Sequence, residues 1–296
     1  MRLACRLCVA GILHVALWTS VAQAQSYRRP PAEIQAVLDA ATAPQLLMSP
    51  SMDVYLLMES WLYPPIGLVA EPMLGLAGLR INPRNNAPHL TDSNTPGRNV
   101  SYRSLRIRRI GSERDLAVSL PADARLGTPK WSPDGRRFAV VQMTADRSDL
   151  WIVDAATGAA ARANVSMNVA YADTWGWMPD GRRLLLTLVP ANRGPVPKAP
   201  EVPPGPNEQE TAGAAPVATF QDTLKNALDE RLFEFFATSQ LALMDVESMR
   251  TTLAGSPSIF LDARPSPDGR LLLVGRVHRP FSYQHVHTAF PRDIEV

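Results

Sequence analysis

Four histidines lie outside the first 24 residues, and they are the side chains best suited to acid–base or metal chemistry at neutral pH. They are His89, His278, His285 and His287. On an extended strand His285 and His287 would share one face, where two imidazoles could bind a metal ion. No third ligand lies close to them in the sequence, so the pattern predicts no metal site.

Nucleophilic and cofactor chemistry have no recognisable motif. The sequence contains no G-x-S-x-G, no H-E-x-x-H and no glycine-rich phosphate loop that opens a helix. Cys5 and Cys8 have the spacing of a redox or metal motif, but both lie in an expected leader segment. We therefore predict no catalytic, cofactor-binding or metal-binding residues and no cofactor, and the residues alone leave open whether the chain is part of an enzyme.

An acidic helix is the remaining candidate for ligand binding. Thr219 followed by Asp222 fits a capping box, and apolar residues continue at helical spacing as far as Phe236. The opposite face carries four charged residues, namely Lys225, Asp229, Glu230 and Glu234. Paired acids could hold the amino terminus of a peptide, although a solvated helix face is the commoner role of such residues.

The element that must organise these residues is a repeated turn. Trp131-Ser132-Pro133-Asp134-Gly135-Arg136 recurs as Trp177-Met178-Pro179-Asp180-Gly181-Arg182 and as Pro265-Ser266-Pro267-Asp268-Gly269-Arg270, each followed by an apolar run. Pro and Gly preset the backbone of a tight reversal, and the short apolar run favours a buried strand. Met48-Ser49-Pro50-Ser51-Met52-Asp53 looks like a degenerate fourth copy.

The spacing of these turns predicts the architecture. The prolines Pro133 and Pro179 are 46 residues apart, while the outer intervals of 83 and 88 residues approach two such periods. Several short strands in a period of about 40–50 residues are typical of a β-propeller. We expect an all-β, incomplete propeller of roughly four to five four-stranded antiparallel blades; unrelated hairpins are the alternative.

The first 24 residues suggest that the protein is exported. Arg2 and Arg6, an apolar centre and Ala22-Gln23-Ala24 predict a signal peptide over residues 1–24 that is cleaved before Gln25. A membrane anchor is the other interpretation of this segment. The leader accounts for the net charge of +2, so residues 25–296 are neutral and give no electrostatic reason to expect nucleic acid or a membrane as partner.

Residues 25–296 are expected to form one partial propeller domain. A short amphipathic helix is predicted over residues 32–41, and a strand ending at a proline over residues 76–83. Residues 104–110 alternate as a half-exposed strand whose arginines form a solvated face rather than a binding stripe. Residues 190–238, which hold seven prolines between 190 and 206, are expected to form one proline-rich and helical insertion.

Several stretches resemble the N-terminal part of the prolyl oligopeptidase family, in its exported glutamyl-endopeptidase-like and dipeptidyl-aminopeptidase-like branch. The likeness covers nearly all of residues 25–296, and the two Trp-x-Pro-Asp-Gly-Arg units are shared with TolB-type propellers. The other matching stretches lie at residues 27–31, 76–83, 205–210, 220–226, 229–233 and 278–283.

The resemblance implies a propeller that restricts substrate access to a C-terminal α/β-hydrolase domain. That domain would supply the catalytic Ser, Asp and His, and no position of this sequence matches them. The resemblance therefore implies that the chain stops before the hydrolase part and is inactive alone.

Three functional readings stay open. The chain is the gating propeller of an exported serine peptidase, a self-sufficient periplasmic propeller of the TolB type that binds a protein, or a decayed reading frame. The first function implies peptide substrates as partners, bound through a missing hydrolase domain. The second implies a protein partner. We expect the location to be periplasmic or secreted, with no contact to a membrane after signal cleavage.

Overall fold

The computed structural model describes residues 29–40, 43–92, 101–122, 124–199 and 220–296. The chain divides into two units, residues 1–41 and residues 42–296, which are described separately. The described part of the first unit holds helix α2 (Ala32–Leu38), as the sequence predicted, with Ile34, Val37 and Leu38 exposed. The expected signal peptide lies outside the described residues. Across the described ranges, no helix is long and apolar enough to cross a membrane.

The second unit is built from the predicted repeat. One complete copy runs through β9 (Lys130–Trp131), β10 (Arg137–Met143), β11 (Ser148–Asp154) and β12 (Ala160–Arg162), each antiparallel to the next. The Pro-Asp-Gly turn joins β9 to β10, where Gly135 has φ +68° and donates its N–H to Ser132 O at 2.9 Å. The turn predicted from the sequence is therefore confirmed.

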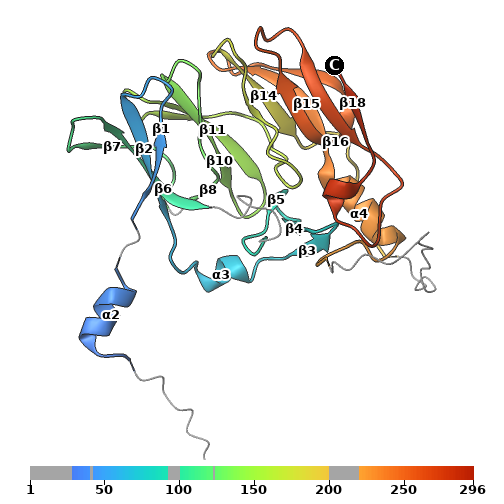
Figure 1. Ribbon diagram of the computed structural model, residues 1–296, viewed down its shortest axis with the longest axis horizontal. Helices are drawn as coiled ribbons and strands as arrows, with labels where there is room; N and C mark the ends of the chain where they lie inside the picture. The colour runs from blue at the N-terminus through green and yellow to red at the C-terminus, as the bar shows by residue number, and fades with distance from the viewer. Residues whose placement is uncertain (1–28, 41–42, 93–100, 123, 200–219) are drawn as a thin grey trace, which may run out of the picture. The chain divides into compact units, whose positions relative to one another are not determined.

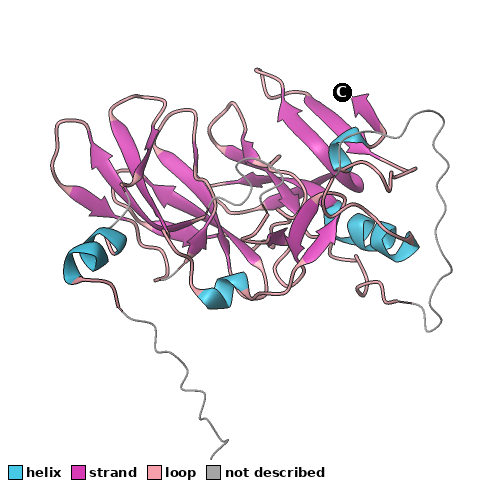
Figure 2. Ribbon diagram, turned by 60° about the horizontal axis from the view of Figure 1, so that its bottom comes forward, coloured by secondary structure: helices cyan, strands magenta, loops and turns pink. Residues whose placement is uncertain are grey.

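The repeat defines four units of antiparallel strands in chain order; the first two belong to one hydrogen-bonded sheet and the last two to another (Figures 1 and 2). The first consists of β1 (Gln45–Met48), β2 (Val54–Ser60), β6 (Tyr102–Arg109) and β7 (Asp115–Ala117). The third consists of β13 (Gly176–Trp177), β14 (Arg183–Leu188), β15 (Thr238–Asp245) and the first half of β16 (Thr251–Pro265). The fourth consists of the second half of β16, β17 (Leu272–Val277) and β18 (Arg292–Glu295).

This arrangement is an incomplete all-β propeller with three four-stranded blades and three strands of a fourth within the described residues. A short strand, β8 (Arg125–Leu126), links the first two blades by pairing with both β6 and β10. Long β16 passes without interruption from the outer edge of the third blade to the inner edge of the fourth. The blade count lies at the low end of the sequence estimate.

The long intervals between turns contain insertions rather than additional blades. Each insertion joins the second and third strands of its blade, at residues 61–101, 189–237 and 278–291. The first carries α3 (Ile66–Val69) and a small sheet of β3 (Leu74–Leu76), β4 (Leu79–Asn82) and β5 (Ala87–Pro88). The second carries α4 (Ala227–Ala237) and the third a 3-10 turn at His287–Ala289. The second of these is the proline-rich and helical insertion expected over residues 190–238, and the first and third are additional to it.

The three insertions share one hydrophobic core. Phe233 of α4 is fully buried and lies edge-on to Phe281 and Phe290 of the last insertion, with ring centroids 5.1 and 5.5 Å away. The small sheet adds Leu79 and Ile81 to the same cluster. Three segments distant in sequence thus bury their apolar side chains together, which stabilises the described parts of the insertions.

Two local predictions were wrong. The stretch from Leu76 to Pro83 is a hairpin, because Ala77 and Gly78 have φ of +54° and +85° and reverse the chain between β3 and β4. The helix expected to open at Thr219 begins instead at Ala227, capped by Asn226, whose side chain accepts the Asp229 N–H at 2.9 Å. Thr219 lies outside the described residues, and Asp222 pairs with Arg80 at 2.8 Å rather than capping a helix.

Candidate functional site

Tryptophans on the inner strands join neighbouring blades. The Trp131 indole N–H donates to Leu47 O of β1 at 3.3 Å, and the Trp177 indole N–H donates to Lys130 O of β9 at 2.8 Å. Both residues directly precede the first residues of their turns, so the same repeat position makes the same contact twice. These bonds connect the first blade to the second and the second to the third.

The turns of neighbouring blades also stack. A Cβ added at Gly135 would lie 2.8 Å from Ser51 Oγ of the first turn, and one added at Gly269 would lie 3.6 Å from Pro179 Cδ. Gly181 approaches Pro133 in the same way. The degenerate first copy thus takes the structural place of a complete turn.

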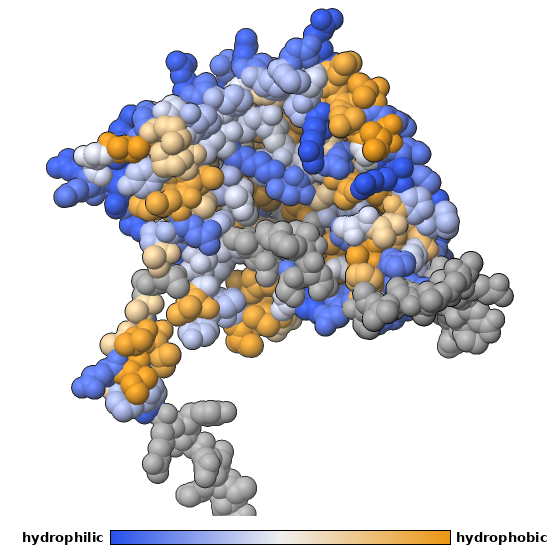
Figure 3. Space-filling model, viewed as in Figure 1, coloured by the Kyte–Doolittle hydropathy of each residue, from blue (hydrophilic) through white to orange (hydrophobic). Residues whose placement is uncertain are grey.

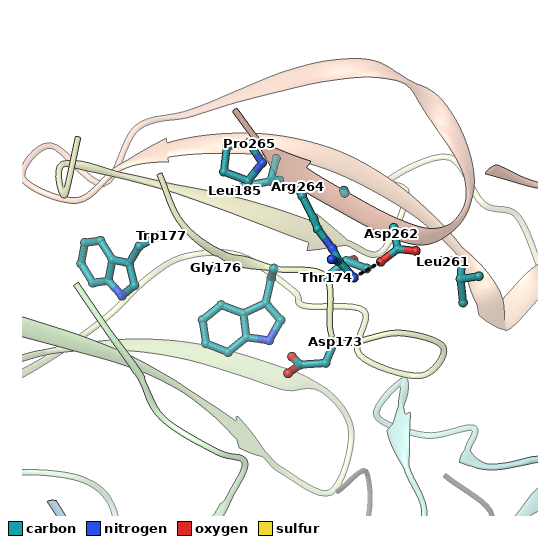
Figure 4. Close-up of a pocket in the computed structure, with 11 residues that line it drawn as sticks. Asp173, Thr174, Gly176, Trp177, Leu185, Leu261, Asp262, Arg264 and Pro265 are labelled. Atoms are coloured by element: carbon teal, nitrogen blue, oxygen red, sulfur yellow. Dashed lines mark hydrogen bonds and ion pairs between the residues drawn. The ribbon is translucent and has the colours of Figure 1, made fainter. Parts of the chain in front are cut away.

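Pro265 stands in the fourth blade where the second and third blades have tryptophan. Proline has neither an indole nor a backbone N–H, so this junction lacks the hydrogen bond that joins the earlier blades. A pocket of about 280 Å³ lies at this junction, between β13 and the second half of β16 (Figure 4). Its lining consists of Asp173, Thr174, Trp175, Gly176, Trp177, Leu185, Leu261, Asp262, Ala263, Arg264 and Pro265.

One wall of the pocket is fixed by Lys130. Its ammonium lies 2.9 Å from Asp173 Oδ1, donates to Trp175 O at 2.6 Å and lies 4.4 Å from the centroid of the Trp175 ring. Burial lowers the pKa of Lys130, and the nearby Asp173 carboxylate opposes that shift. These contacts hold Asp173 and Trp175 in place and leave Asp173 with a cationic partner.

The opposite wall carries an exposed ion pair and unused donors. Arg264 Nη2 donates to Asp262 Oδ1 at 2.8 Å, and the Arg264 side chain is 75% exposed, so this pair is weakly held (Figure 4). Thr174 Oγ1 is buried without a hydrogen-bond partner in the part of the chain that the structure describes. The exposed donors at the mouth of the pocket therefore belong to Arg264, whereas the Thr174 hydroxyl is enclosed.

The acidic residues of α4 contact an arginine of the same chain. Arg279 Nε lies 2.7 Å from Glu234 Oε1, and Arg279 Nη1 also pairs with Glu230. The bond to Glu234 is the largest cause that raises the pKa of Arg279, and burial, followed by Glu230, raises the pKa of Tyr283. Both carboxylates are engaged by Arg279, so the structure gives no support for a free amino-terminus site.

The remaining acidic and basic residues of this helix have structural contacts. Asp229 accepts the backbone N–H of Lys225 at 2.8 Å, which completes the capping arrangement at the start of α4.

The arginines of β6 also pair within the chain. Arg106 and Arg108 pair with Asp115 at 2.7 and 2.5 Å, and Arg106 also pairs with Glu59. These two arginines neutralise carboxylates of the same blade.

His285 and His287 do not share a strand face. His287 is buried, begins the 3-10 turn and lies edge-on to Tyr171 with ring centroids 5.1 Å apart, whereas His285 packs beside Phe220. His89 is buried in the first insertion, and His278 lies beside Asp293 at 3.6 Å. Within the described ranges no cluster of three or more His, Cys, Asp or Glu residues could hold a metal ion.

The pocket was missed at the level of sequence. The sequence offers one signal of this pocket: in the aligned repeat copies Pro265 occupies the position of Trp131 and Trp177. Thr174 and Arg264 carry no motif, because their positions depend on how the third and fourth blades pack.

Successive four-stranded units with stacked turns define a β-propeller. The chain is similar to two plant proteins, both named "Probable glutamyl endopeptidase, chloroplastic". It is 34% identical over 287 residues to the Oryza sativa subsp. japonica protein and 32% over 285 residues to the Arabidopsis thaliana protein, with 91% of this chain covered each time. The chain spans 29% of the length of each relative. No model of a known protein family matches.

Among solved structures, Pyrococcus horikoshii acylaminoacyl peptidase in its orthorhombic form matches with a TM-score of 0.41 and 12% identity, covering 88% of this chain and 33% of that one. The fold is that of a β-propeller, and the two relatives that the chain resembles over 91% of its length are both named as peptidases.

Proposed function

We propose that the chain is the substrate-access propeller of an exported serine peptidase of the prolyl oligopeptidase family. The observation that carries the proposal is the 34% identity that extends over 287 residues of a relative named as a glutamyl endopeptidase. The match accounts for 29% of the length of that relative. In the proposed protein the catalytic residues would lie in the remaining part, which fits the finding that this sequence contains no nucleophile motif.

In this role the propeller positions peptides rather than cleaving them. A serine hydrolase needs a nucleophile, a base and oxyanion donors in one geometry, and these would come from an α/β-hydrolase domain. The blades present here would form part of a ring that limits access to the hydrolase domain by size.

An antibody against the chain tests this proposal in the cells that produce it. We expect immunoprecipitation from the exported fraction to bring down a polypeptide that reacts with a fluorophosphonate probe, either as the same chain or as one bound to it. Purified residues 25–296 serve as the control and should not react. Efficient capture of the chain without any labelled polypeptide would contradict the proposal, and a co-purified unlabelled protein would favour a TolB-type binding module.

A further inference from the structure

The three interfaces between successive blades differ in the apolar surface that they bury. Among the described residues, the cluster of buried apolar side chains holds eleven residues between the first and second blades and twelve between the second and third. The cluster between the third and fourth blades holds six, which are Met178, Leu185, Leu241, Phe260, Ala263 and Val274. Because buried apolar surface holds packed sheets together, the fourth blade has the weakest attachment through its strands.

The same interface lacks the indole hydrogen bond and contains a cavity. Pro265 stands at the position from which Trp131 and Trp177 bond to the preceding blade, and the pocket of about 280 Å³ lies beside it (Figure 4). Strand β16 runs through the interface, and its pairing with β17 shifts register between Phe260 and Asp262. Such an irregularity bends a strand, so β16 offers a hinge at the point where it enters the fourth blade.

The fourth blade has a second attachment through its insertion. Residues 279–290 of this insertion, here called the latch, lie between β17 and β18 and contact helix α4. Arg279 pairs with Glu230 and with Glu234 of α4, and 2.7 Å separate Arg279 Nε from Glu234 Oε1. These ion pairs join the fourth blade to the insertion of the third blade, outside the interface between their strands.

Apolar and backbone contacts complete the latch. Phe281 and Phe290 are buried against Phe233 of α4. The His287 N–H donates to Ala77 O at 2.8 Å, in the hairpin between β3 and β4. The latch therefore ties the fourth blade to the insertions of both the first and the third blades.

We propose that the fourth blade is a hinged part of the propeller that the latch holds closed. When the latch leaves α4 and the β3–β4 hairpin, the fourth blade turns about β16, and the interface at Pro265 widens while each blade stays folded. Local opening of this kind begins at the least stable contacts of a structure, and the small cluster of this interface supplies them. The inference concerns motion of the blades and goes beyond the proposed function, on which it does not depend.

An introduced cysteine can report the opening of each interface. The chain has no cysteine other than Cys5 and Cys8, so mass spectrometry can assign a maleimide label to the new site. Ala263→Cys places a thiol between the third and fourth blades and Ala139→Cys places one between the second and third, and both alanines are at most 3% exposed. We expect Ala263→Cys to react about tenfold faster than Ala139→Cys, once each rate is divided by the rate of the same variant unfolded in urea.

A charge variant tests whether the latch holds the blade closed. Arg279→Gln removes both ion pairs and should raise the labelling rate of Ala263→Cys about threefold or more, without changing that of Ala139→Cys. Arg106→Gln is the matched control, because Arg106 also pairs with two carboxylates but lies in the first blade. It should change neither rate.

A second variant releases the latch without altering a charge. Gly78 has φ +85°, and a Cβ added there would overlap the Val286 side chain of the latch. Gly78→Ala should therefore raise the labelling rate of Ala263→Cys about tenfold. Gly194→Ala is the control, because Gly194 has φ +78° and an added Cβ would meet nothing within 4 Å, so it introduces the same backbone strain without touching the latch.

Three results would overturn the inference. Equal acceleration at both cysteines would show that the blades open together. An unchanged rate at Ala263→Cys in both Arg279→Gln and Gly78→Ala would show that the latch does not hold the fourth blade. Equal rates at the two cysteines in the chain with an unaltered latch would show that this interface opens no more readily than its neighbour.

Discussion

Met52 occupies the position at which the other three turns have glycine. Its φ is +60°, close to the +65° to +68° of Gly135, Gly181 and Gly269, and its N–H donates to Ser49 O at 3.0 Å as the glycines do to their own turns. The backbone of the degenerate copy is therefore conserved in shape although its sequence has changed. A non-glycine residue in this conformation is strained by roughly 1–2 kcal/mol.

Met52→Gly should stabilise the fold. Relief of the strain exceeds the extra chain entropy that glycine loses on folding, so we expect a net gain of about 0.5–1 kcal/mol. The Met52 side chain is 64% exposed, so little packing is lost. Urea unfolding would measure the change in the free energy of unfolding. A variant less stable than the unaltered chain would show that contacts of the Met52 side chain stabilise the fold by more than its backbone strain destabilises it.

Gly135→Ala should destabilise more than Gly111→Ala. Both glycines have positive φ, at +68° and +78°, so both variants incur the same backbone strain. A Cβ at Gly135 would also meet Ser51 Oγ at 2.8 Å, whereas one at Gly111 meets nothing within 4 Å. The difference in unfolding free energy between the variants therefore reports the stacking of turns, and equal losses would argue against it.

His89 should make the fold sensitive to mild acid. The imidazole accepts from the Thr91 N–H at 3.2 Å through Nδ1 and lies 3.1 Å from Glu71 O through Nε2, which suits the neutral ring. Burial is the main cause that lowers its pKa, and Arg125 and Arg80 act in the same direction, whereas Glu71 opposes them.

The sign of the pH effect follows from that lowered pKa. In the unfolded chain the ring takes up a proton near pH 6.5, while in the fold it resists protonation, so stability falls as pH drops below about 6.5. Urea unfolding between pH 7.5 and 5.5 should show this slope in the unaltered chain and a reduced slope in His89→Gln. His278→Gln, at an exposed histidine, is the control and should keep the original slope.

At the scale of elements, the insertions act as one unit around α4. Phe233 contacts Tyr171, Phe281 and Phe290 at centroid distances of 5.1 to 5.7 Å, so it links the second and third insertions to the chain segment between blades two and three. Its burial is complete, in contrast to the partly buried Phe235 of the same helix.

Phe233→Ala should cost about 3–5 kcal/mol, as for other fully buried aromatic residues. Phe235→Ala should cost less, because that ring keeps part of its surface in water and packs mainly against Phe236 and Arg193. Thermal unfolding followed by circular dichroism would rank the two variants. Similar losses would mean that the insertions do not share the core assigned to them.

The repeat and the insertion over residues 190–238 could be predicted from the sequence, but the start of helix α4 and the pocket could not. The turn geometry at Gly135 depends on local residues, so Pro-Asp-Gly predicts it directly. The start of α4 depends on competition between caps: Asp222 is engaged by Arg80, 142 residues away, and the helix begins at the next suitable cap, Asn226. The pocket at Pro265 depends on the packing of two blades, which no single motif encodes.

At the scale of the whole described propeller, the last blade presents an open edge. Among the described strands β18 pairs only with β17, and its backbone edge is unpaired on the other side. Leu271, Leu273, Ile294 and Val296 are 44% to 81% exposed, and hydrophobic side chains gather over β15, β16 and β18 in the surface view (Figure 3). Phe281, which belongs to the same C-terminal stretch, is buried in the core of the insertions.

An exposed strand edge beside apolar side chains favours pairing with another chain. We therefore expect purified residues 25–296 to associate, with a mass in size-exclusion chromatography with light scattering that rises with concentration. Ile294→Lys should lower that mass, because it places a charge on the edge strand. Ile66→Lys, at a similarly exposed residue of α3, is the control and should leave the association unchanged. A monomer at every concentration would show that the edge is protected, and the independent-propeller reading would then be favoured.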